Sequence, residues 1–234
     1  MFRTETTLVV GAGANREIEM PDGPELLNRI TASFDFDRLG SEVQSRDLVN
    51  LAEIFEATAP RCNASTEDLM NAGRKIRAAA SITTSIESIM EQLSDDPLVT
   101  IAGKIGIVYH TLHAEAKSTL AREPRVKGEM PLRGTENWLF KLGQMIVTGA
   151  PRREAENCFY KLSIIAFTYD RAIEHYLRGL PRWLSGWISM RLVHWSICMS
   201  GLFIRSARQA NCLGSRMTNQ LPIGDRLNPM IMQN

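Results

Sequence analysis

The pattern of apolar and polar positions predicts two strands, one near each end of the first 180 residues. Residues 7–10 (TLVV) are β-branched and apolar, and they stop at a glycine turn, Gly11-Ala12-Gly13-Ala14. Residues 162–167 (LSIIAF) form an apolar run of strand length. Runs of this kind are typical of parallel sheets that are covered on both faces. We therefore expect both strands to be buried in one parallel sheet.

Apolar residues recur at helical spacing between and after these strands. In residues 24–34, for example, Leu26, Leu27 and Ile30 fall on one helical face. Ser65 stands before one predicted helix and Asp95-Asp96 before another, and both are good capping residues. The predicted helices cover residues 24–34, 45–58, 66–80, 81–93, 97–121, 136–147 and 169–180.

The order of these elements predicts the fold class. Two buried strands, each leading through a turn into a helix, indicate an α/β fold with a Rossmann-like parallel sheet. We expect one domain over residues 1–180, with a helical insertion at about 40–150. Stable sheets typically have four to six strands, so the predicted sheet is incomplete.

Composition and charge narrow the class of protein. The chain has 234 residues and a formal net charge of +1, which gives no support for nucleic acid as a partner. Its four cysteines are scattered without a CxxC pair, so neither a zinc site nor a disulfide framework is expected. The apolar run after Arg3 is too short for a signal peptide. These features together predict a cytoplasmic protein.

The composition changes abruptly near Pro181. Residues 181–234 contain six arginines, no lysine, one acid and three of the four tryptophans. Three interpretations of this tail stay open. Residues 183–204 are long enough to span a membrane, but Arg191 and His194 within them disfavour this. Alternatively, the tail is a genuine appended helix and loop, or it is a frame-shifted or disordered stretch that follows a truncation.

The glycine turn after the first strand has two interpretations. Gly11 and Gly13 match the first half of a dinucleotide-binding fingerprint, in which glycines let the backbone approach a phosphate. The third glycine is absent, because Arg16 stands there. Taken alone, the motif indicates either a phosphate-binding turn or a structural turn.

Four segments together resemble the sirtuin-like (silent-information-regulator-type) NAD-consuming domains, in their bacterial, defence-associated branch. These segments are GAGANREIEMPDGPELLNRI, SIESIM, AGKIGIVYHTLHAEAKSTL and SIIAFTYDRAIEHYL. The first resembles the family's GAG-A/S turn, which is followed by Leu/Ile-Pro and a glycine before a helix. The last resembles the family's strand followed by Phe-Asn-Tyr-Asp. The ordered set covers about residues 6–180.

This resemblance implies an antiviral NAD hydrolase, which cleaves the bond between nicotinamide and ribose through an oxocarbenium-like transition state. It implies that Asp170, at the family's Asp position, fixes the loop beside the site. The partner implied is NAD, as substrate or ligand, and a homo-oligomer stays open. The implied NAD-binding residues are Gly11, Ala12, Gly13, Ala14, Asn15 and Pro21.

The chain departs from the family at both catalytic positions. Thr168 stands where the family has the asparagine of Phe-Asn-Tyr-Asp, and a hydroxyl lacks the paired donor and acceptor of a carboxamide. The family's histidine-bearing His-Pro-Tyr-Gly loop has no counterpart after Leu180. We therefore expect NAD binding with weak or no hydrolysis. The alternative is a catalytically inactive nucleotide-binding or interaction module, or a truncated remnant of a defence protein.

The remaining candidates are expected to be structural. His110 and His113 lie three positions apart with Glu115 nearby, but a third metal ligand is not evident. We expect this pair to lie on a partly exposed helix surface, and His175 to be exposed as well. No metal site is expected.

Overall fold

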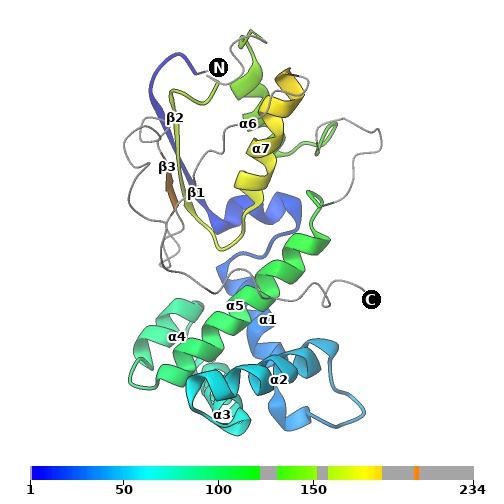
Figure 1. Cartoon of the computed structure of the whole chain (residues 1–234), viewed down its shortest axis with the longest axis vertical. Coiled ribbons are helices and arrows are strands. Elements are labelled where there is room, and N and C mark those ends of the chain that lie inside the picture. Colours follow the sequence, from blue (N-terminus) through cyan, green and yellow to red (C-terminus); the bar gives the residue numbers. More distant parts are fainter. Residues whose placement is uncertain (1, 122–130, 152–157, 186–202, 206–234) are drawn as a thin grey trace.

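The computed structural model describes residues 2–121, 131–151, 158–185 and 203–205. The described chain is mixed α/β and mostly helical, which confirms the coarse fold class. Figure 1 shows two bodies, a small sheet with helices α6 and α7 beside it and a separate block of helices. Each body has its own hydrophobic core.

The sheet contains the two predicted strands as a parallel pair. Strand β1 (Thr6–Gly11) pairs with β2 (Leu162–Phe167), and the register places Gly11 opposite Phe167. A third short strand, β3 (Phe203–Arg205), pairs antiparallel with β2 and gives the order β1-β2-β3. This strand was not predicted. The three interpretations of the tail concern a segment that is mostly not described. The residues outside the described ranges there are 186–202 and 206–234.

Only one face of the sheet is buried by described residues. Helices α6 (Trp138–Val147) and α7 (Ala172–Ser185) join Val10 and Ile164 in the core of the sheet body. On the other face Val9 is 61% exposed and Phe167 is 54% exposed. The expectation that both strands are covered on both faces is therefore wrong for the described part of the chain.

The helical body is built from α1 to α5. Its core contains a cluster of three phenylalanine rings, Phe34, Phe36 and Phe55, with centroids 5.3–5.6 Å apart. The elements are α1 (Gly23–Ser33), α2 (Arg46–Thr58), α3 (Thr66–Ala79), α4 (Ile86–Gln92) and α5 (Pro97–Lys117), with short 3₁₀ turns η2 (Phe36–Arg38) and η3 (Ala59–Cys62). The core of this body covers residues 26–107, whereas the expected insertion was 40–150, because α1 packs in the helical core and α6 packs on the sheet.

The helix starts follow from their capping residues. The Ser65 hydroxyl accepts from the backbone N–H of Asp68, whose carboxylate accepts in turn from the Ser65 N–H, so α3 begins with a capping box. Ser45 caps α2, and the Asp96 side chain accepts from the N–H of Leu98 at the start of α5. The caps proposed from the sequence at Ser65 and Asp96 are confirmed.

Helix α5 runs through both bodies. Near its middle, Gly106 allows a close approach to α1, since a Cβ there would lie 3.0 Å from Ile30 and 3.1 Å from Phe34. Further along, Ala114 belongs to the core of the sheet body. Within the described ranges, no helix combines the length and the apolar character needed to cross a bilayer.

His110 on α5 faces inward, which contradicts the exposed surface expected for the histidine pair. It is 4% exposed, and its Nε2 lies 2.7 Å from the Ser33 hydroxyl oxygen. The same hydroxyl also lies within hydrogen-bond distance of the Ile30 carbonyl, at 2.8 Å. His175 is exposed as expected. In the described ranges, no group of three or more His, Cys, Asp and Glu side chains could hold a metal.

Candidate functional site

The glycine turn continues from β1 directly into a short 3₁₀ helix, η1 (Ala12–Ile18). Because Gly11 is paired with Phe167 in the parallel sheet, the residues that follow the two strands come together at one edge. These residues are Ala12 after β1 and Thr168 after β2. The carboxyl ends of parallel strands are where α/β proteins most often bind ligands.

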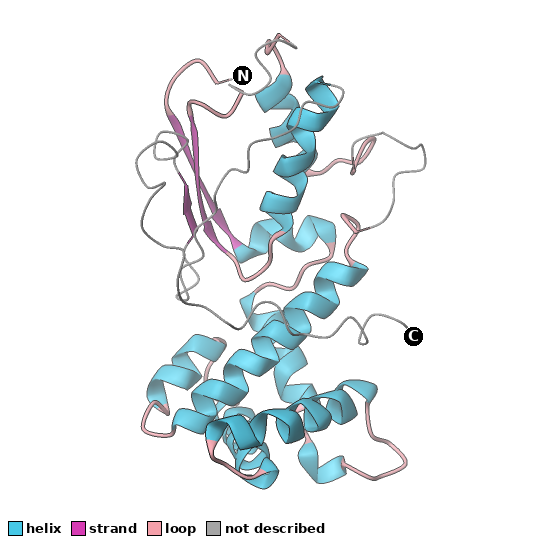
Figure 2. Cartoon of the chain, in the orientation of Figure 1, coloured by secondary structure: helices cyan, strands magenta, loops and turns pink. Residues whose placement is uncertain are grey.

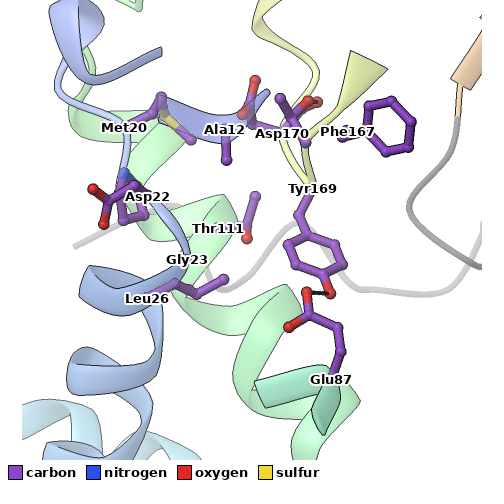
Figure 3. A pocket seen from close by; sticks show the side chains of 12 residues that line it. Ala12, Met20, Asp22, Gly23, Leu26, Glu87, Thr111, Phe167, Tyr169 and Asp170 are labelled. Carbon is purple, nitrogen blue, oxygen red and sulfur yellow. Dashed lines mark hydrogen bonds between the residues drawn. The ribbon is translucent and has the colours of Figure 1, made fainter. Parts of the chain in front are cut away.

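A pocket of about 180 Å³ lies at this edge, between the sheet body and the helical body. In Figure 3, Tyr169 and Glu87 form one side, while Asp22 and Leu26 lie on the other. Thr111 of α5 lies between the two sides. The pocket is lined by Ala12, Met20, Pro21, Asp22, Gly23, Leu26, Glu87, Thr111, Phe167, Thr168, Tyr169 and Asp170.

The structure brings half of the residues implied by the resemblance into this pocket. Ala12, Pro21, Thr168 and Asp170 line it. Asn15 does not line it but contacts one of the lining residues, Asp170. The other three, Gly11, Gly13 and Ala14, belong to the same turn without lining the pocket.

Asp170 is fixed by contacts on both sides of the site. The Asn15 side-chain amide donates to its two carboxylate oxygens at 2.9 and 3.0 Å. The backbone N–H of Ala172 donates to the same carboxylate at 3.0 Å, at the start of α7. Asn15 is 0% exposed, and its Oδ1 has no hydrogen-bond partner among the described residues. These contacts tie the turn after β1 to the turn after β2.

Thr168 is buried at the pocket and its hydroxyl is engaged locally. The hydroxyl donates to the backbone carbonyl of Asp170 at 3.3 Å. A hydroxyl has one proton, so in this arrangement Thr168 has none to offer a ligand. Thr168 therefore helps to hold its own loop in shape.

Tyr169 and Glu87 join the two bodies across the pocket. The Tyr169 hydroxyl donates to Glu87 Oε1, and the Ser85 hydroxyl donates to Glu87 Oε2 at 2.5 Å. Burial raises the pKa of Glu87, but these two hydrogen bonds, together with one from its own backbone N–H, hold the pKa below its usual value. Burial and the neighbouring carboxylate both raise the pKa of Tyr169. Glu87 is thus an anion at neutral pH, and Tyr169 is a neutral donor.

The charged side chains that line the pocket are all acidic. Asp22, Glu87 and Asp170 contribute carboxylates, and no lysine or arginine is among the described lining residues. Asp22 is partly neutralised, because it caps α1 through the N–H of Glu25 and pairs with Arg16 at 3.2 Å. A negatively charged ligand group therefore finds no cationic side chain inside this pocket.

Sequence reasoning did not assign several lining residues to a site. Glu87 and Thr111 come from helices α4 and α5, which lie far from the glycine turn in the sequence. Asp22 carried a local signal, since an aspartate before Gly-Pro is a typical helix N-cap. Tyr169 sits within the TYD segment, but nothing local indicates its contact with Glu87.

We compared the chain with family models, with curated proteins and with solved structures, and none of them matches.

Proposed function

We propose that residues up to about 180 form a sirtuin-like domain with a Rossmann-like sheet, which binds NAD in the cytoplasm and hydrolyses it weakly or not at all. The observation that carries this proposal is the parallel pairing of β1 and β2. Its register sets the glycine turn beside Thr168 and Asp170, as the motif resemblance requires.

The space around the turn fits a ligand. A Cβ atom built on Gly11 or Gly13 would meet no atom of the described residues within 4 Å, so the backbone there is not covered by them. No side chain caps the start of η1, and its first turn has no acidic residue that would repel an anion. These features support a phosphate contact at the turn, outside the acidic pocket.

The acidic side chains of the pocket suit one end of a dinucleotide, although the pocket is small. Pockets for drug-sized ligands usually measure roughly 300–1,000 Å³, and this one has about 180 Å³. Carboxylates from Asp22 and Glu87 suit the ribose hydroxyls and the positively charged pyridinium better than they suit pyrophosphate. We infer that the ribose and nicotinamide end enters the pocket while the phosphates lie at the turn.

The residues at the pocket support weak catalysis. General acid–base groups typically contribute about 10²–10⁴-fold to a rate, and the described pocket lining contains no histidine. The Thr168 hydroxyl is used within its own loop. These two observations favour the alternative of an inactive nucleotide-binding module over an efficient hydrolase.

Two assays on the purified chain test the proposal. Thermal unfolding with NAD or ADP-ribose measures binding, and etheno-NAD cleavage measures hydrolysis. Ala12→Leu fills the pocket from its wall and is expected to abolish the ligand-induced rise in Tm. Ala121→Leu makes the same change at an exposed position outside the pocket, and it should keep that rise.

Each assay can contradict a different part of the proposal. A Tm that neither nucleotide raises in the unmodified chain refutes the binding site. Etheno-NAD turnover within about tenfold of an efficient glycohydrolase refutes the loss of catalysis, since the missing groups predict a deficit of at least about 100-fold.

A further inference from the structure

The contact between Tyr169 and Glu87 connects two separately packed bodies. Tyr169 follows β2 of the sheet body, yet its side chain packs against the core of the helical body. Glu87 lies in the first turn of α4, a helix of seven residues. Figure 3 shows the tyrosine reaching from the end of β2 to this carboxylate along the side of the pocket.

The strength of this contact comes from the charge on Glu87, which is an exposed residue. Hydrogen bonds to a charged group are stronger than those between neutral groups. Both oxygens of Glu87 already accept a hydrogen bond, one from Tyr169 and one from Ser85. The lowered pKa of Glu87 keeps this carboxylate charged throughout the neutral range.

The contact also borders a pocket that is smaller than most ligand sites. With Tyr169 bonded to Glu87, the pocket has about 180 Å³, below the roughly 300 Å³ at which ligand sites usually begin. Turning the Tyr169 and Glu87 side chains apart would widen it. Glu87 is exposed, so its side chain has room to turn toward solvent, whereas α4 itself is held by Ile86 and Ile89 in the helical core.

We propose that the Tyr169–Glu87 hydrogen bond is an autoinhibitory latch, which holds the pocket narrow and must break before a nucleotide enters. The inference rests on the proposed function only for the identity of the ligand. When only some of the molecules are open, the apparent affinity equals the intrinsic affinity multiplied by the open fraction. Removing the hydroxyl therefore increases affinity, whereas removal of an ordinary ligand contact would decrease it.

Tyr169→Phe tests the latch, and Tyr109→Phe is its matched control. Tyr109 also donates to a carboxylate on another helix, Asp47, at 2.8 Å, but it does not line the pocket. Calorimetric titration with ADP-ribose and NAD measures affinity. Hydrogen exchange of residues 83–92 in the ligand-free protein reports the loosening of the backbone around Glu87, independently of any ligand.

We expect Tyr169→Phe to bind ADP-ribose about tenfold more tightly and to exchange faster over residues 83–92. Tyr109→Phe should change neither. Unchanged exchange, or affinity that is equal or weaker in Tyr169→Phe, overturns the latch while nucleotide binding by the parent chain still supports the proposed function. Faster exchange with no nucleotide bound by any variant supports the latch and refutes the proposed function.

Discussion

The side-chain amide of Asn15 donates to both carboxylate oxygens of Asp170, at 2.9 and 3.0 Å, across 155 positions of sequence. Both residues are buried, and they lie in the two turns that follow β1 and β2. Because a buried carboxylate is costly without hydrogen bonds, this pair stabilises the very edge of the sheet at which the pocket lies. Removing this hydrogen-bonded pair should therefore lower the stability of the folded chain, whether or not a ligand is bound.

We expect Asn15→Ala to lower the free energy of unfolding by about 2 kcal/mol, the usual range for a lost hydrogen bond to a buried charge. Urea unfolding at pH 7 measures this. A loss below about 0.5 kcal/mol would mean that the pair does not hold the two turns together.

Asn15→Asp should be more destabilising than Asn15→Ala at pH 7, because it places two carboxylates against each other. The folded variant relieves this repulsion by binding a proton, so its deficit relative to the parent chain should shrink as the pH falls from 7 to 5. The same urea experiment at both pH values measures the change. A deficit that grows on acidification contradicts the assigned contact.

Because His110 is buried, we expect the folded chain to lose stability in mild acid. Burial lowers the pKa of His110 from 6.5 to about 4, against the opposing effect of Asp47, and Arg29 and His113 lower it further. Between pH 6.5 and 4 the unfolded chain binds the proton and the folded chain does not, so stability is full above pH 6.5 and falls below it. The loss from this residue alone between pH 7 and pH 5 is about 2 kcal/mol.

The control for this pH dependence is His110→Gln, which cannot titrate. This variant should be less stable at pH 7 because the contact with Ser33 is changed, but its unfolding free energy should depend less steeply on pH between 7 and 5. Equal slopes for the parent and the variant would mean that His110 is protonated normally in the folded chain.

We expect a side chain added at Gly143 to overpack the contact between α6 and α7. A Cβ there would lie 2.7 Å from the Tyr176 hydroxyl and 3.2 Å from Leu180, and Tyr176 is itself buried. Gly143→Ala should therefore destabilise the sheet body by about 1–3 kcal/mol. Gly179→Ala, on α7 in open space, should instead stabilise by up to about 1 kcal/mol. Thermal unfolding of both variants checks the difference in sign.

Local signals in the sequence were enough for much of the fold. Capping residues and apolar periodicity placed the helices within a few residues, as at Ser65 and Asp96. The β-branched run after Thr6 and the apolar run after Lys161 became the parallel pair. These features depend on neighbours within one or two turns of chain, which is why a single sequence reveals them.

Features that depend on long-range packing were not predictable. The apolar character of Val9 indicated burial, but the described chain covers only one face of the sheet. His110 looked like a surface residue because its partner Ser33 is 77 positions away. The Glu87–Tyr169 contact joins residues 82 positions apart. Half of the site residues implied by the resemblance line the pocket. The lining residues from α4 and α5, Glu87 and Thr111, could not be predicted.

The central claim is that the glycine turn and the adjoining pocket bind a dinucleotide. Gly13→Val blocks the open space at the turn, while Gly179→Val makes the same substitution in open space on α7. Calorimetric titration with ADP-ribose should show saturable binding to the parent chain and to Gly179→Val, and none to Gly13→Val. Equal binding by all three proteins, or binding by none, would contradict the claim.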